Sequence, residues 1–286
     1  MHGYPFSFPT SGYLRPIGGH SKALIPGVLA IHSLPFLRVF LEIGGRATAI
    51  KLETKDEGVL VFAPIPWGPE AQRFLKTLEP NKEISEINVK YLVAPDVEHH
   101  MALKSWKDQF PNAKIFGPKP LIEKKKSEGI TIDYAFDDAD SKILLTEENI
   151  NSRSTLDIPS EITREFDFAY FPHHPNKELV LLHKPTKTFL TADLFFNLPS
   201  FEQYEGSHIN PVGGLSFLTK YLSIDSWLQK KIFGSALPKK DYEGVLNAIY
   251  QWGFERIIPC HGDVLEDLNV RDRFANLFAK YIKNPN

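Results

Sequence analysis

The segment "YLVAPDVEHHMALKSW", residues Tyr91 to Trp106, places two adjacent histidines between a predicted strand and a predicted helix. The apolar run that opens it is typical of a buried strand, Pro95 and Asp96 end that strand, and a helical pattern begins near His100. Because α/β folds bind ligands at the carboxyl ends of their strands, His99 and His100 are candidates for a binding site. The alternative is that both are ordinary surface residues.

Three later segments repeat this design, in which an apolar strand ends abruptly in a polar side chain. They are "FAYFPHH" with His173 and His174, "TFLTAD" with Asp193, and "RIIPCHGD" with His261 and Asp263. Neutral imidazoles and a carboxylate suit Zn²⁺ or another divalent transition metal, and an open coordination position would activate water. Taken singly, each of these residues also fits a turn, a helix cap or a solvent-exposed position.

The pattern of the whole chain predicts an α/β protein with two packed sheets and helices outside them. Residues 38–66 show successive strand-like runs, with Gly44-Gly45 expected as a hairpin turn. Strand–helix alternation then continues to Gly129. The second half predicts strands at 166–171, 178–183 and 188–192, a helix, a strand ending at Cys260, and a closing helix.

The first 35 residues contain five prolines and no acidic residue. The prolines forbid a continuous amphipathic helix, so we expect an extended arm over residues 1–35 and a single domain over residues 36–286. The Gly-, Pro- and aromatic-rich segment Phe195 to Lys240 predicts a long excursion that could cover a pocket.

Composition limits the classes of function. The net charge of -2 favours neither a nucleic-acid nor a membrane partner, no apolar run approaches the length of a membrane span, and we expect a small-molecule substrate. A single cysteine, Cys260, excludes an intramolecular disulfide and indicates a reducing compartment. We expect a cytoplasmic protein, with mitochondrial import of the acid-poor N-terminus as the alternative. Oligomeric state is left open.

The ordered set of motifs resembles the metallo-β-lactamase superfamily. "TFLTAD" is similar to that family's strand before a Gly-Asp pair, and "ERIIPCHGD" is similar to its late strand closing on His-Gly. "YLVAP…HH…W…FP…AKIFGP" and "KPTKTFLTADLFFNLP" more narrowly resemble an uncharacterised branch, known as a domain of unknown function. The resemblance implies a four-layer αββα sandwich with a metal site at one edge of its two sheets.

The family's H-x-H-x-D-H motif is degenerate here. With its last histidine placed on His100, Pro95 and Val97 replace the first two histidines, and His99 replaces the aspartate. The resemblance therefore implies at most one divalent metal, with Zn²⁺ preferred. Its implied ligands are His99, His100, Asp193 and His261. It implies an accessory or substrate-contacting role for His173, and Trp67 is a candidate pocket wall or core residue. Asp96 or Glu98 could supply a nearby carboxylate.

Two functions remain from the sequence. The first is a mononuclear metal-dependent hydrolase of an ester, thioester or phosphoester. The second is a catalytically inactive binding or scaffold protein on the same fold, which the lost ligands favour. A redox enzyme with iron at this position is a third class, disfavoured because no Gly-rich phosphate loop follows a strand.

Overall fold

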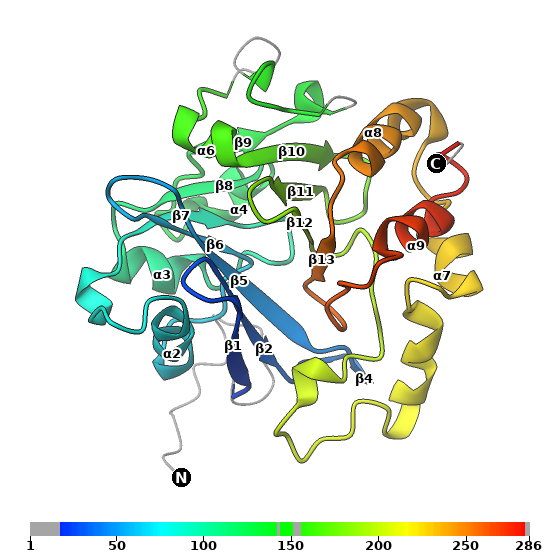
Figure 1. Ribbon diagram of the computed structural model, residues 1–286, viewed down its shortest axis with the longest axis horizontal. Helices are drawn as coiled ribbons and strands as arrows, with labels where there is room; N and C mark the ends of the chain where they lie inside the picture. The colour runs from blue at the N-terminus through cyan, green and yellow to red at the C-terminus, as the bar shows by residue number, and fades with distance from the viewer. Residues whose placement is uncertain (1–17, 142–143, 151–155, 284–286) are drawn as a thin grey trace.

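The computed structural model describes residues 18–141, 144–150 and 156–283. Its larger sheet has the order β1-β2-β5-β6-β7-β8-β9 and its smaller sheet the order β10-β11-β12-β13 (Figure 1). The strands of the larger sheet are β1 (His20–Ile25), β2 (Leu29–Leu34), β5 (Gly45–Lys51), β6 (Val59–Phe62), β7 (Val89–Val93), β8 (Lys114–Pro118) and β9 (Tyr134–Phe136). Those of the smaller sheet are β10 (Phe166–Phe171), β11 (Glu178–His183), β12 (Thr188–Thr191) and β13 (Arg256–Pro259).

Both sheets are mixed. Strands β1, β2, β5 and β6 pair in antiparallel fashion, and β6 to β9 pair in parallel. In the smaller sheet only the β12–β13 pair is parallel. A separate hairpin joins β3 (Leu37–Arg38) to β4 (Leu41–Glu42).

The helices surround these sheets (Figure 1). They are α2 (Pro69–Leu78), α3 (Leu103–Gln109), α4 (Leu121–Lys126), α6 (Ser160–Glu165), α7 (Trp227–Ile232), α8 (Lys239–Gln251) and α9 (Val270–Leu277), with 3₁₀ turns η1 (Ile84–Glu86), η2 (Asp138–Asp140), η3 (Glu202–Tyr204) and η4 (Gly214–Leu222). In the described residues, no helix combines the length and the apolar character needed to cross a membrane.

Three hydrophobic clusters define four layers. One cluster fills the space between the two sheets, with Phe62 of β6 and Phe168 of β10 among its members. A second joins the outer face of the larger sheet to α2, α3 and α4, and a third joins the outer face of the smaller sheet to α8 and α9. Strands such as β6 and β11 are covered on both faces, and their sequences are nearly continuous apolar runs. The molecule is the expected αββα sandwich.

Two expectations are corrected. Residues 20–34 do not form an arm but strands β1 and β2 of the larger sheet, because Pro26 and Pro35 lie beside the strand ends and interrupt neither strand. Gly44-Gly45 is not a hairpin turn, since β4 and β5 do not pair. Gly44 instead adopts a φ of 66° and leads into β5.

Candidate metal centre

Three segments from both sheets meet at one edge of the sandwich. His99 follows β7, Asp193 follows β12 and His261 follows β13. Their ligand atoms all lie within 4.8 Å of one another. The Nε2 atoms of His99 and His261 are 3.2 Å apart, and His261 Nε2 lies 3.4 Å from Asp193 Oδ1. The structure thus brings together three of the four residues that we expected as ligands.

His99 is oriented by Asp96, which is fully buried at the end of β7. The Asp96 carboxylate accepts hydrogen bonds from the backbone N–H groups of Glu98 and His99, and His99 Nδ1 lies 2.8 Å from its Oδ2. Because a carboxylate only accepts, Nδ1 is the donor and Nε2 points toward His261. Burial lowers the pKa of His99, but the charges of Asp96 and Asp193 outweigh it and raise the pKa to about 10. The negative charges around this ring therefore favour a cation.

His261 is held by a different partner. Its Nδ1 donates to the carbonyl of Gly44 at 2.7 Å, which leaves Nε2 as the acceptor that faces the other two residues. Burial lowers the pKa of His261 to about 4, with the nearby His99 acting in the same direction. His261 is therefore a neutral imidazole with a lone pair directed at the cluster.

Asp193 is fixed from two sides. Asn176 Nδ2 donates to Asp193 Oδ2 at 2.5 Å. The fully buried Glu178 accepts from the backbone N–H of Asp193, from the N–H of Ala192 and from the Thr191 hydroxyl, each at 2.7 Å. Burial, together with the charges of Asp96 and Asp193, raises the pKa of Glu178 to about 8. These contacts hold the turn after β12.

Arg46 of β5 braces the loop that carries His261. Its side chain is fully buried and donates to the carbonyls of Pro259 at 2.9 Å and Gly262 at 2.6 Å, and to Glu202 at 2.8 Å. Gly262 has a φ of 102°, and a Cβ there would lie 2.2 Å from the carbonyl oxygen of Asn197. Only glycine therefore fits the close approach beside His261.

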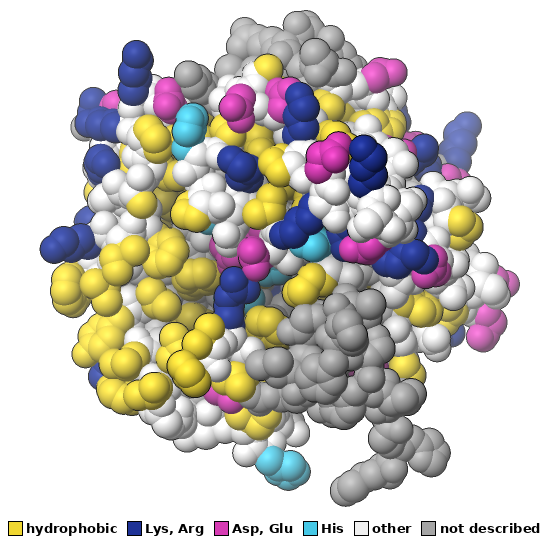
Figure 2. Space-filling model, turned by 180° about the vertical axis from the view of Figure 1, so that it is seen from behind, with side chains coloured by type: hydrophobic (Ala, Val, Ile, Leu, Met, Phe, Trp, Pro, Cys, Tyr) yellow, Lys and Arg dark blue, Asp and Glu magenta, His cyan; other side chains and the backbone are white. Residues whose placement is uncertain are grey.

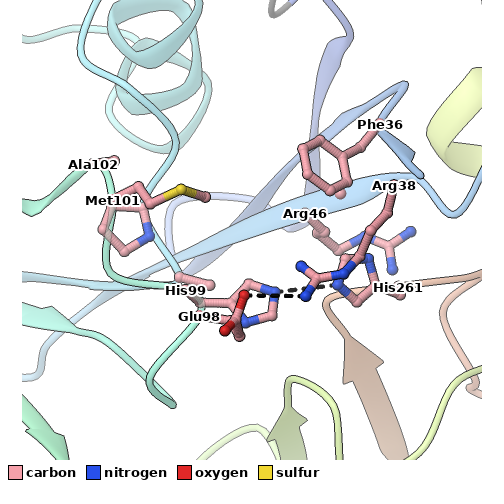
Figure 3. Close-up of a pocket in the computed structure, with 11 residues that line it drawn as sticks. Phe36, Arg38, Arg46, Glu98, His99, Met101, Ala102 and His261 are labelled. Atoms are coloured by element: carbon pink, nitrogen blue, oxygen red, sulfur yellow. Dashed lines mark hydrogen bonds and ion pairs between the residues drawn. The ribbon is translucent and has the colours of Figure 1, made fainter. Parts of the chain in front are cut away.

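A shallow cavity that opens to solvent lies beside His99 and His261 (Figure 3). Arg38 and Glu98 form an ion pair across it at 3.1 Å. Its lining residues are Phe36, Arg38, Gly45, Arg46, Ala63, Pro64, Glu98, His99, Met101, Ala102 and His261. The cavity leaves the cluster open to solvent on the side where one cationic and one anionic side chain, Arg38 and Glu98, lie.

His100 lies apart from the three converging residues. Its side chain is mostly buried, and its Nδ1 has no hydrogen-bond partner in the described part of the chain. Burial, together with the charges of Lys125 and Lys124, lowers the pKa of His100 to about 4. Among the described residues, the ligand atoms that converge belong to His99, Asp193 and His261, so of the two adjacent histidines only His99 is part of the cluster.

Two accessory candidates also lie elsewhere. His173 is exposed and its Nδ1 is 3.1 Å from the hydroxyl of Tyr242, whereas its neighbour His174 is buried. Trp67 packs edge-on against Trp106 and Phe110 in the outer core, at centroid distances of 5.0 and 5.2 Å. The core interpretation of Trp67 is therefore supported.

The excursion 195–240 contacts the segment that carries His261. No residue of it is among those that line the cavity in the described chain. Gln203 instead donates to the carbonyl of Cys260 and accepts from Gly262 N–H, both at 2.8 Å. The ring of Phe196 lies 5.7 Å from that of His261.

Sequence reasoning missed Arg46, Asn176 and Glu178. Arg46 had a usable signal, because a charged residue inside an apolar strand needs buried partners. Asn176 and Glu178 follow a Pro-flanked turn and carry no local signal. Of the two carboxylates left open, Asp96 contacts His99, and Glu98 lines the cavity.

Solved structures with the same fold include metallo-β-lactamases. The chain matches TMB-1 (11% identity, 92% of this chain and 98% of that chain, TM-score 0.53) and the enzyme from Pontibacter korlensis (12%, 92% and 99%, 0.52). It also matches the Flv1 flavodiiron core from Synechocystis sp. PCC6803, covering 92% of this chain and 60% of that chain at 12% identity and TM-score 0.57. The protein therefore has the metallo-β-lactamase fold, with a candidate triad of metal ligands at the sheet edge.

Within that fold the family can be stated. The family model described as domain of unknown function DUF4336 matches residues 37–205, and the chain belongs to this family. A comparison with curated proteins found no match. The matched region includes His99 and Asp193, and His261 lies beyond it.

Proposed function

We propose that the protein binds one divalent metal through His99, Asp193 and His261 and hydrolyses a small ester, thioester or phosphoester. The supporting observation is the spacing of the donor atoms. Tetrahedral zinc with bonds of about 2.0–2.1 Å separates its ligand atoms by roughly 3.3 Å, and the measured separations are 3.2 and 3.4 Å. The donors converge at this spacing while facing a cavity.

Around these ligands, the chain supplies the supporting contacts that metal sites use. Asp96 and the Gly44 carbonyl orient the two imidazoles, as carboxylates and carbonyls do behind metal-bound histidines. A metal bound here would polarise a substrate oxygen and lower the pKa of a water molecule. Glu98 is the cavity carboxylate that would accept a proton, and Arg38 would neutralise an anionic substrate group.

Zinc is the metal that we propose. Two imidazoles and one carboxylate form the ligand set of hydrolytic zinc sites with an open position. One fold neighbour, FIM-1 from Pseudomonas aeruginosa, was solved in a mono-zinc form, with 12% identity and a TM-score of 0.52. The same donor set also serves iron, and the Flv1 core was metal-soaked. Elemental analysis separates the two metals.

The test is the metal content of protein purified without chelator. We expect close to one equivalent of zinc in the wild type and in His208→Ala, which changes an exposed histidine of the excursion. Asp193→Ala and His261→Ala should lose the metal. Adding zinc should raise the melting temperature of metal-depleted wild type, because a ligand at 100 times its Kd stabilises by about 2.7 kcal/mol. Metal-free wild type without a zinc-induced shift contradicts the proposal.

His100→Ala tests the fourth residue expected from the sequence. Since His100 lies apart from the cluster, we expect this variant to keep its zinc. Loss of zinc in His100→Ala, with an unchanged melting temperature of the metal-free protein, would place His100 among the ligands.

An inactive binding protein on the same fold is the second candidate. The observation in its favour is that Glu98, the cavity carboxylate, is already paired with Arg38. Turnover of p-nitrophenyl and thioester probes by zinc-loaded wild type, and its loss in Glu98→Gln, supports the hydrolase. Full zinc occupancy without turnover of any of these probes supports the binding protein.

We further infer a reducing compartment, the cytoplasm by preference and the mitochondrion as the alternative. Cys260 is the single cysteine of the chain and is a buried free thiol.

A further inference from the structure

Helix η4 buries polar side chains and exposes apolar ones, the reverse of the usual arrangement. Its polar residues Ser216 and Thr219 are buried, while Leu215 and Phe217 are 56% and 49% exposed. Ser216 Oγ accepts from the backbone N–H of Glu42 at 2.8 Å. The polar side therefore attaches this turn to the domain, and the apolar side faces outward.

Helix α7 repeats this inversion. Gln229 is fully buried and bonds to both the N–H and the carbonyl of Phe196, at 2.9 and 2.8 Å. Trp227 and Ile232 of the same helix are 66% and 48% exposed. A helix that folds only against its own domain has the opposite arrangement, with its apolar face inward.

The two elements contact each other, so their exposed apolar side chains lie on neighbouring parts of the surface. We call it the outward face and define it by Leu215, Phe217, Leu218, Tyr221, Trp227 and Ile232. Hydrophobic side chains gather on the side of the molecule where η4 and α7 lie (Figure 2). Contiguous apolar surface of this kind marks an interaction site in soluble proteins.

The segment that carries the outward face has an excess of lysine. Residues 211–240 contain five lysines and a single acidic residue, Asp225, although the whole chain has a net charge of -2. Asp225 is bound by Arg273 through both carboxylate oxygens, at 3.1 and 2.7 Å. Lys220 lies over the rings of Phe217 and Tyr221. The net charge of the whole chain gives no indication of this local excess of positive charge.

We propose that the outward face docks on an anionic lipid bilayer. Tryptophan and tyrosine favour the boundary between headgroups and acyl chains, and amphipathic helices with lysines around their apolar side lie in that boundary. Lysines near the surface add attraction to anionic lipids. A symmetric contact with a second copy would instead place lysines against lysines. Docking would hold η4, and the β3–β4 hairpin that it contacts, at the bilayer surface.

Co-sedimentation with vesicles tests this proposal on the full chain. We expect binding to vesicles of phosphatidylcholine with phosphatidylserine, little binding to phosphatidylcholine alone, and weaker binding as salt is added. Trp227→Ala should lower the partition coefficient about tenfold, from the lost burial of its ring. Lys231→Gln should lower it about fivefold.

Matched variants on α4 provide the controls. Ile122→Ser removes an exposed apolar side chain and Lys126→Gln an exposed lysine, both outside the outward face, and neither should change binding. Absence of binding to the anionic vesicles overturns the proposal. So does a wild-type dimer in size-exclusion chromatography that Trp227→Ala converts to a monomer without any vesicle binding, because the partner is then a second copy.

Discussion

Replacing Arg46 by methionine is expected to destabilise the fold where both sheets meet the candidate metal centre. The buried guanidinium donates to two backbone carbonyls, to the hydroxyl of Ser33 at 3.2 Å and to the carboxylate of Glu202 at 2.8 Å. Methionine has a similar volume but no donor, so all of these acceptors lose their partner.

Breaking a buried ion pair by removing one partner costs about 3–5 kcal/mol. The Glu202 side chain is 38% exposed, so water compensates part of its loss and we expect the lower end, about 3 kcal/mol. In a chain of this length each kcal/mol shifts the melting temperature by about 2 °C, which gives a decrease of roughly 6 °C.

Urea unfolding followed by circular dichroism measures this loss. Arg164→Met is the matched control, because Arg164 is exposed and, within the described residues, its side chain donates to the carbonyl of Ser160 on the same helix. We expect Arg164→Met to stay within about 0.5 kcal/mol of the wild type. Equal unfolding midpoints for the two variants would refute the assignment of Arg46 as the brace of the His261 loop.

Three further predictions follow from the same contacts. Gly262→Ala should cost about 2 kcal/mol more than Gly206→Ala in urea unfolding, because both glycines have positive φ but only the first meets a neighbouring backbone atom; equal costs contradict this. Asp96→Asn should weaken zinc binding about 10- to 100-fold in a chelator competition, by loosening the orientation of His99; an unchanged affinity speaks against that role. His32 is buried, and burial lowers its pKa from 6.5 to about 4, so the unfolded state binds more protons between these values. The contribution of His32 to the free energy of unfolding is therefore complete above pH 6.5 and is lost as the pH falls toward 4, by up to about 3 kcal/mol. The difference in unfolding free energy between wild type and His32→Gln should change by this amount over that range. A difference that stays constant with pH contradicts the prediction.

Much of the fold can be predicted from the local pattern of apolar and turn residues. Strands β10, β11 and β12 lie within a residue of their predicted bounds, because strands covered on both faces are short apolar runs bounded by turn residues. The sequence pattern does not predict strands β1 and β2, since the prolines beside their ends favour an extended arm. Pairing between strands is a nonlocal property, and Gly44-Gly45 gave no indication that β4 and β5 belong to different sheets.

By itself, the sequence determined that imidazoles and a carboxylate end several buried strands, and that the histidine-rich motif is degenerate. Only the tertiary structure decided which side chains converge. His99 is part of the cluster and His100 is not, and the Asp96 carboxylate holds both the backbone N–H and the ring of His99. The inversion of η4 and α7 is equally nonlocal, since their buried polar side chains bond to Glu42 and Phe196, residues distant in sequence. Side-chain direction after a strand depends on such contacts, and no local periodicity encodes them.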